Sequence, residues 1–185
     1  PVIGGVGLIV NINNKVNQYL KKDKNIILQI GKNFGQLYQS VFLEEIYSIT
    51  DGPPPEINLS NEKNNGLTVL KLINNKLASS VHDISSGGLL QALAEMTFKS
   101  NYGLKINKPK NLSNLMEYYF SEDQGRYLIE IEPDNLNKIN KILDENNVFN
   151  EIIGTVQKDY FEVAGELKIN INKLYNVNNT WYNNY

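Results

Sequence analysis

The chain has no cysteine and only one histidine among its 185 residues. Disulfides, thiolate metal sites and a cysteine nucleophile are therefore excluded, as is a zinc site built from several imidazoles. The sequence also lacks any apolar run near the ~20 residues that span a bilayer, and no basic segment with an apolar core and a cleavage site opens it. We expect a cytoplasmic protein without a membrane partner.

A strong charge of one sign is missing as well. Lys and Arg total 18 against 20 Asp and Glu, which gives a formal net charge of −2. Without a basic field the chain has no long-range attraction for phosphate backbones, so nucleic acid is not an expected partner. The remaining composition, 41% hydrophobic and 21% charged, is that of an ordinary globular protein with one sizeable core.

Apolar patterns of period two and of helical period alternate along the chain. Strands are predicted at residues 25–30, 77–84, 102–107, 126–132, 152–156, 160–164 and 167–171. Helices are predicted at residues 35–47, 88–99, 114–120 and 136–146, and around a core stripe of Leu67, Leu70, Leu72 and Ile73. This order favours an α+β domain whose helices pack on a mixed, mostly antiparallel sheet.

The two ends of the chain depart from this pattern. Residues 1–12 open with an apolar, glycine-punctuated run that reads as a β-strand and has no initiating Met. We interpret residues 1–12 as the end of a preceding domain with its linker strand, and residues 13–185 as one domain. The Asn-rich and Tyr-rich tail, from Tyr175 through Trp181 to Tyr185, is assigned to docking on a neighbour or to closing the core.

The most informative local pattern is a predicted strand that meets a predicted helix through two glycines. Glycines let backbone N–H groups approach an anion, and the helix dipole favours negative charge at that point. One interpretation is a phosphate or nucleotide site made of Asp83, Ser85, Ser86, Gly87 and Gly88. The alternative is a helix cap with a tight turn, for which the same residues suffice.

The single histidine, His82, lies directly before this turn. An imidazole can act as a general acid or base near neutral pH. No nucleophile or second base lies near it in the sequence, so a structural role is favoured and no catalytic residue is assigned. The neighbouring Asp83 is a better candidate for assisting a phosphate-bound Mg²⁺, which takes only one or two protein carboxylates.

The second candidate site is the hexapeptide 121–126, Ser-Glu-Asp-Gln-Gly-Arg, between a predicted helix and a predicted strand. Glu122 and Gln124 can bond ribose hydroxyls or an amide, and Arg126 can pair with a phosphate in bidentate fashion. With Ser121 they define a candidate cleft for a hydroxylated, phosphorylated ligand. The alternative is a solvated loop with a local ion pair, which contributes little.

Four segments, in this order along the chain, resemble one family. They are Pro1-Val2-Ile3-Gly4-Gly5-Val6-Gly7-Leu8-Ile9, Gly52-Pro53-Pro54-Pro55-Glu56-Ile57-Asn58-Leu59, Val81-His82-Asp83-Ile84-Ser85-Ser86-Gly87-Gly88-Leu89 and Phe120-Ser121-Glu122-Asp123-Gln124-Gly125-Arg126. With them the chain resembles the C-terminal part of the phosphoribosylformylglycinamidine synthases of purine biosynthesis. The resemblance implies a three-layer α/β/α domain, like the C-terminal domain of aminoimidazole ribonucleotide (AIR) synthetase.

The resemblance also implies an activity for the intact enzyme. The family's ligase converts formylglycinamide ribonucleotide, ATP and glutamine-derived ammonia into formylglycinamidine ribonucleotide, ADP and phosphate. The implied cofactors are ATP/ADP and Mg²⁺. The implied partners are the N-terminal ATP-binding domains of the same polypeptide, a glutaminase subunit or domain that supplies ammonia, and the small-molecule nucleotide substrate. The resemblance implies that residues 1–12 are the end of the preceding ATP-binding domain. The 185 residues alone are expected to be inactive.

Two other interpretations stay open. The chain can instead belong to a related enzyme, such as AIR synthetase or selenophosphate synthetase, although the Gly-Pro-Pro-Pro and Ser-Glu-x-Gln-Gly-Arg segments argue against this. It can also be a non-catalytic scaffold that binds an auxiliary nucleotide or nothing. The resemblance supports this second alternative, because the family's enzymes have two similar halves and residues 121–126 correspond to the second-half copy of a substrate-binding segment.

Overall fold

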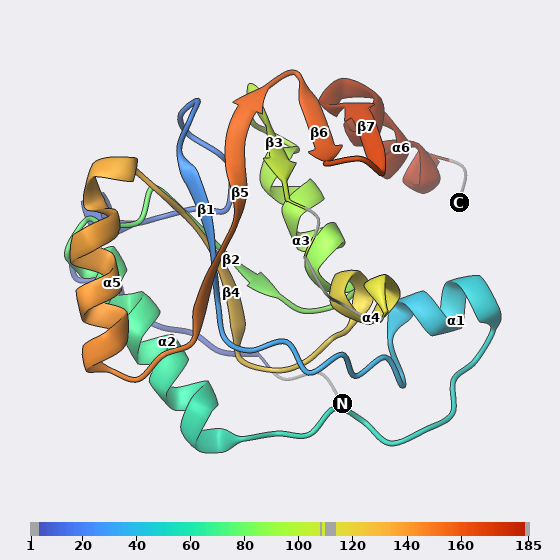
Figure 1. Ribbon diagram of the computed structural model, residues 1–185, viewed down its shortest axis with the longest axis horizontal. Helices are drawn as coiled ribbons and strands as arrows, with labels where there is room; N and C mark the ends of the chain where they lie inside the picture. Colours follow the sequence, from blue (N-terminus) through green and yellow to red (C-terminus); the bar gives the residue numbers. More distant parts are fainter. Residues whose placement is uncertain (1–3, 108, 110–113, 184–185) are drawn as a thin grey trace.

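A seven-stranded mixed sheet forms the centre of the protein (Figure 1). The computed structural model describes residues 4–107, 109 and 114–183. The strands run in the order β2-β4-β1-β5-β3-β6-β7, and each pair of neighbours is antiparallel except β3 and β6. Their bounds are β1 Ile26–Ile30, β2 Ser80–Ile84, β3 Tyr102–Ile106, β4 Arg126–Ile131, β5 Asn150–Lys158, β6 Tyr160–Val163 and β7 Leu167–Asn170.

Helices cover both faces of this sheet (Figure 1). Their bounds are α1 Val41–Tyr47, α2 Leu59–Asn74, α3 Gly88–Thr97, α4 Leu115–Phe120, α5 Leu136–Glu145 and α6 Ile171–Asn183, with short 3-10 turns at Ile12–Asn14 and Pro133–Asn135. Helices α2 and α5 pack on one face, and α3 and α4 on the other. The predicted α+β class and its three-layer α/β/α arrangement are confirmed.

Alternation along the central strand β1 explains the two cores. Ile27 packs in the cluster under α3, whereas Leu28 and Ile30 pack in the cluster under α2 and α5. All three side chains are fully buried, and each such burial stabilises the fold by roughly 1.5–3 kcal/mol. A strand with apolar side chains on each face therefore packs against both helix layers.

The predicted helix at residues 35–47 is too long. Helix α1 begins only at Val41, after Ser40, whose hydroxyl accepts the N–H of Leu43 at 3.3 Å. The backbone of Gly35 has a φ of 75°, which lies outside the helical region. The stretch before α1 is instead a loop whose N–H groups donate to a distant carboxylate, as described below.

The predicted core stripe of α2 is partly wrong. Leu67 and Leu70 are 55% and 50% exposed, whereas Val69 and Leu72 are buried. The buried face of the helix instead includes Asn65, whose side chain donates to the carbonyl of Gly125 at 2.9 Å. Leu67 and Leu70 lie outside this buried face.

In its described part, residues 4–12, the N-terminal run does not form the predicted strand. Residues 4–10 have no strand structure, and Val6 and Leu8 are fully exposed; Pro1 to Ile3 lie outside the described residues. The outer edge of β2 is met by a different segment, since the carbonyl of Asn17 accepts the N–H of Val81 at 3.1 Å. The domain division at residue 12 stays a prediction.

The tail forms helix α6, which the sequence pattern did not predict. Leu174 packs against the core, and the ring of Tyr175 lies 5.9 Å from that of Phe98 between centroids. Val177 and Trp181 on the same helix are 64% and 60% exposed, and Tyr185 lies outside the described residues.

Among the helices that the structure describes, none is both long and apolar enough to cross a bilayer.

A buried carboxylate ties the segment before β1 to the sheet. Glu130 on β4 is fully buried. It accepts the backbone N–H groups of Lys21 at 2.9 Å and Lys22 at 3.0 Å, the amide of Asn25 at 2.8 Å and the hydroxyl of Ser80 at 2.9 Å. Donors from the segment before β1 and from β2 thus compensate the burial of the carboxylate.

Candidate functional site

The glycine pair between β2 and α3 has the conformation that only glycine adopts readily. Gly87 and Gly88 have φ values of 80° and 71°. A Cβ atom on Gly88 would lie 2.7 Å from the carbonyl carbon of Phe120 and 2.7 Å from the carbonyl oxygen of Ser121. The two predicted site segments, separated by more than thirty residues, are therefore in direct contact.

Glu122 occupies the N-terminus of α3. Its Oε1 accepts the N–H of Gly87 at 2.8 Å and the N–H of Val41, the first residue of α1, at 2.8 Å. Helix N-termini favour a negative charge, and here one carboxylate serves two of them. The N–H group of Gly87, which the sequence analysis assigned to a possible phosphate site, instead donates to a carboxylate of the chain itself.

Replacing Glu122 by alanine should lower stability by about 1–2 kcal/mol, because the N–H groups at both helix starts lose their acceptor. Glu122→Gln keeps a side-chain oxygen and should lose less. Urea unfolding followed by circular dichroism measures both. Equal stability of Glu122→Ala and the unchanged chain would mean that water replaces the carboxylate at both helices.

The polar residues before the glycines lie at the surface. Ser85 and Ser86 are exposed, and the side chain of Asp83 is 63% exposed. Burial alone would raise the pKa of Asp83, but hydrogen bonds from the Ser85 side chain and its own backbone, together with His82, bring it below its ordinary value. The imidazole of His82 lies between two carboxylates, with Nε2 2.7 Å from Glu95 and Nδ1 3.3 Å from Asp83.

Most of the hexapeptide faces inward. Ser121 is fully buried and donates to the Asn33 amide oxygen at 3.2 Å. Arg126 is 1% exposed, and its guanidinium donates to the carbonyls of Ser121 at 2.6 Å and Asp123 at 3.1 Å. Burial lowers the pKa of Arg126, and Asp123 partly opposes this. Gln124 alone of the predicted residues in this segment is exposed.

Asp123 has a role that the sequence analysis did not assign. Its carboxylate accepts the backbone N–H groups of Phe34 at 2.9 Å, Gly35 at 3.1 Å and Gln36 at 3.2 Å. Three N–H groups on one carboxylate fix the loop that follows β1. The hexapeptide therefore positions both the start of α3 and this loop.

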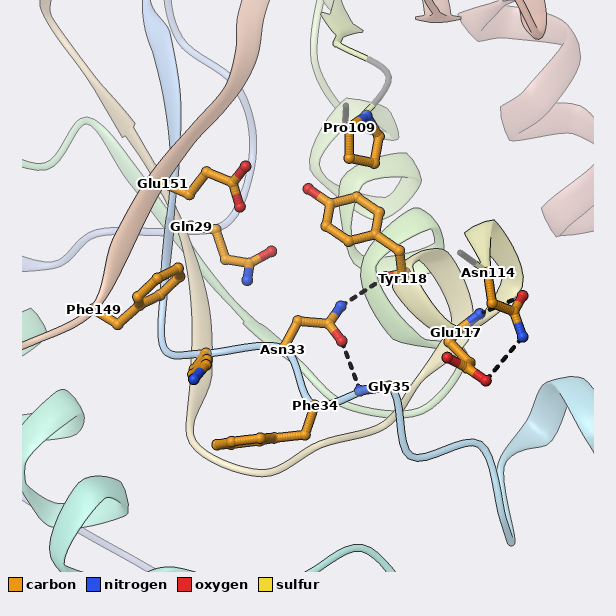
Figure 2. Close-up of a pocket in the computed structure, with 11 residues that line it drawn as sticks. Gln29, Asn33, Phe34, Gly35, Pro109, Asn114, Glu117, Tyr118, Phe149 and Glu151 are labelled. Atoms are coloured by element: carbon orange, nitrogen blue, oxygen red, sulfur yellow. Dashed lines mark hydrogen bonds between the residues drawn. The ribbon is translucent and has the colours of Figure 1, made fainter. Parts of the chain in front are cut away.

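The loop after β1 forms one side of a pocket that the sequence analysis missed (Figure 2). Its volume is about 310 Å³. The amide of Gln29, the carboxylate of Glu151 and the hydroxyl of Tyr118 are turned toward the same space (Figure 2). The lining residues are Gln29, Lys32, Asn33, Phe34, Gly35, Pro109, Asn114, Glu117, Tyr118, Phe149 and Glu151.

Gln29 is the unusual residue of this pocket. Its side chain is fully buried, and its Nε2 donates to the carbonyl of Gly31 at 3.1 Å, whereas its Oε1 has no hydrogen-bond partner. Because a carbonyl can only accept, the Gly31 contact fixes the amide with its nitrogen on that side. The only available signal in the sequence was a single polar residue inside the apolar strand Ile-Ile-Leu-Gln-Ile.

Burial also perturbs the ionisable groups around Gln29. It raises the pKa of Glu151, and it raises that of Tyr118, with a further contribution from the charge of Glu151. A carboxyl with a raised pKa in the folded state stabilises the fold only while it is protonated. Ionisation of Glu151 therefore lowers the free energy of unfolding.

Stability should depend on pH through Glu151. The folded pKa lies above the ordinary value of 4.5, so the contribution of Glu151 is fully present below that pH and is lost as pH rises through the folded value. Glu151→Gln should match the unchanged chain at pH 4 and exceed it slightly in stability at pH 7. Urea unfolding at both pH values measures this, and a gain at pH 4 equal to that at pH 7 would contradict it.

Comparison with known proteins identifies the family of this chain. The family model described as AIR synthase related protein, C-terminal domain, matches residues 39–165. The chain belongs to this family. The glycine pair, Glu122 and most of the sheet lie inside the matched AIR synthase related region.

Relatives of this AIR synthase related chain are PurL subunits of phosphoribosylformylglycinamidine synthase. That of Pelagibacter ubique is 48% identical over all of the chain and 25% of its own length. That of Bartonella bacilliformis is 36% identical over 98% of the chain and 25% of its own length. The chain thus spans about a quarter of the length of the curated relatives that it matches.

Solved structures share the AIR synthase related fold at low identity. T. maritima PurL complexed with FGAR superposes with a TM-score of 0.75 at 17% identity, over 89% of this chain and 30% of that one. The hydrogenase maturation protein HypE of E. coli superposes with a TM-score of 0.58 at 15% identity, over 84% of this chain and 51% of that one. At these identities the likeness shows the fold alone.

Proposed function

We propose that the chain is the C-terminal part of a PurL-type phosphoribosylformylglycinamidine synthase. The observation that carries the proposal is the 48% identity to the Pelagibacter ubique PurL subunit along the entire chain. The intact enzyme is then an ATP-dependent ligase of purine biosynthesis. It joins glutamine-derived ammonia to formylglycinamide ribonucleotide, and it releases formylglycinamidine ribonucleotide, ADP and phosphate.

The proposal includes ATP/ADP and Mg²⁺ as cofactors of the intact enzyme. Support comes from T. maritima PurL, which was solved with ATP and with ADP. Among the residues that the structure describes, no group of three or more His, Cys, Asp and Glu side chains is arranged for a metal ion. Mg²⁺ takes one or two protein carboxylates and completes its shell with substrate oxygens, and the exposed carboxylate of Asp83 suits that mode.

Within this proposal the predicted site residues divide into two groups. Asp83, Ser85, Ser86 and Gln124 have exposed polar side chains and are the ones that we propose as the wall of a nucleotide or substrate cleft. Gly87, Gly88, Ser121, Glu122 and Arg126 hold that wall by the contacts described above. The carboxylate at the start of α3 also favours the scaffold interpretation, in which the domain supports its partners and touches no ligand.

The proposed partners are the N-terminal ATP-binding domains of the same polypeptide, a glutaminase subunit or domain, and the nucleotide substrate. A chimera tests the activity: this chain replaces the matching quarter of the Pelagibacter ubique subunit. We expect the chimera to release phosphate from ATP in the presence of formylglycinamide ribonucleotide and ammonium, and the chain alone to release none. A chimera that is folded but inactive would overturn the proposal.

Calorimetric titration distinguishes the interpretation as a ligand-binding wall from the interpretation as a scaffold that touches no ligand. The folded chimera is titrated with Mg-ADP and with formylglycinamide ribonucleotide, with Asp83→Asn and Ser85→Ala beside the unchanged chimera and Lys141→Ala on α5 as a control. Weaker binding in the first two variants alone supports a ligand wall. Unchanged binding in all of them supports the scaffold.

A further inference from the structure

The pocket beside Gln29 is rich in hydrogen-bond acceptors. Glu117 and Glu151 contribute carboxylates and Lys32 is the only basic side chain among the lining residues that the structure describes. Tyr118 adds a hydroxyl and Gln29 an amide oxygen. An anion would meet two carboxylates here, so the lining selects a ligand that donates hydrogen bonds and carries positive charge.

Two of these acceptors are free. Gln29 Oε1 is fully buried without a partner, and the carboxylate of Glu151 has no hydrogen bond or ion pair within the described part of the chain. Asn33, in contrast, is already satisfied: its Nδ2 donates to the carbonyl of Tyr118, and its Oδ1 accepts from Gly35 and Ser121. A buried acceptor left unpaired is unfavourable, so a ligand N–H directed at Gln29 is stabilised.

The rim of the pocket favours a flat ligand. The rings of Phe34 and Phe149 border the space and are 62% and 47% exposed (Figure 2). The ammonium of Lys32 lies 5.6 Å from the centroid of the Phe34 ring, so this ring already accommodates a cation. A planar cation can lie on such a ring while its N–H groups point inward.

We infer that this pocket binds a small planar organic cation with several N–H donors, of the amidinium or guanidinium class, through Gln29 Oε1 and the Glu151 carboxylate. A fork of N–H groups matches an amide oxygen beside a carboxylate better than a spherical ion does. The volume of about 310 Å³ lies at the small end of ligand pockets.

Benzamidine is the probe, and benzamide and benzoate are its comparators, since all three share one ring and differ in charge and donors. Titration of the 185-residue chain, followed by amide chemical shifts in NMR spectra, gives the affinities. We expect benzamidine to bind about tenfold more tightly than benzamide, by the strength of a charge-assisted hydrogen bond, and benzoate not to bind.

Two variants test whether Gln29 and Glu151 bind the cation. Gln29→Met removes the amide at similar size, and Glu151→Gln removes the charge at an exposed position. Each should weaken benzamidine binding about tenfold. Glu145→Gln on α5, across the sheet, should leave it unchanged. If Gln29→Met fails to fold, Glu151→Gln decides the result.

Three outcomes would overturn the inference: no benzamidine binding at millimolar concentration, equal affinity for benzoate, or an unchanged affinity in Glu151→Gln. The ligase reaction plays no part in this assay. The inference therefore stands or fails independently of the proposed function.

Discussion

Glu130→Ala is expected to cost about 3 kcal/mol or more of unfolding free energy, a large fraction of the stability of an ordinary domain. The substitution leaves the part-buried N–H groups of Lys21 and Lys22 and the buried Asn25 amide without their acceptor. Urea unfolding gives the magnitude. Amide hydrogen exchange gives the location, because the N–H groups of Lys21 and Lys22 should lose protection first.

Glu132 is the matched control for Glu130. It lies two residues further along, and its side chain is 45% exposed and pairs with Lys22 at 3.1 Å. Surface ion pairs contribute little, so Glu132→Ala should change stability by less than about 0.5 kcal/mol. A loss as large as that of Glu130→Ala would mean that general charge, and not the buried network, controls stability.

Gly88→Ala should be the second severe substitution, costing more than about 3 kcal/mol. Part of the cost is the left-handed backbone, which disfavours any residue with a Cβ by about 1–2 kcal/mol. The larger part is contact, because the new methyl group would lie 2.7 Å from backbone atoms of Phe120 and Ser121, and a backbone cannot rotate away as a side chain can. Thermal and urea unfolding measure the total.

Gly165 separates these two contributions. Its φ of 78° is similar to that of Gly88, yet a Cβ there would meet nothing within 4 Å. Gly165→Ala should therefore show the backbone cost alone, about 1–2 kcal/mol. Similar losses at both positions would show that α3 can shift away from the hexapeptide, and that their close contact is not required.

Local patterns were sufficient for the elements that bury one clear face. In α5 the predicted stripe of Leu136, Ile139, Ile142 and Leu143 packs against the sheet. Strand β4 lies within its predicted range, but both of its faces are buried, so burial does not follow the predicted alternation. The helix start at Gly88 was also predicted, because two glycines ahead of an amphipathic run are a strong local signal.

Contacts between distant segments were beyond such patterns. The helix predicted from residue 35 fails because Asp123, almost ninety residues away, accepts the N–H groups of the loop. The same is true of the candidate site: the residues of the hexapeptide were identified, but their contact with the glycine pair required the fold. The pocket beside Gln29 draws on several separate segments, and no short motif represents it.

The sheet order has a consequence for the time course of folding. Strand β1 lies between β4 and β5, where Ile26 faces Ile131 on one side and Thr155 on the other. During synthesis the early strand thus waits, with both edges unpaired, until most of the chain has emerged. Long-range pairing of this kind slows folding, and an apolar strand with unpaired edges is prone to aggregate until its partners arrive.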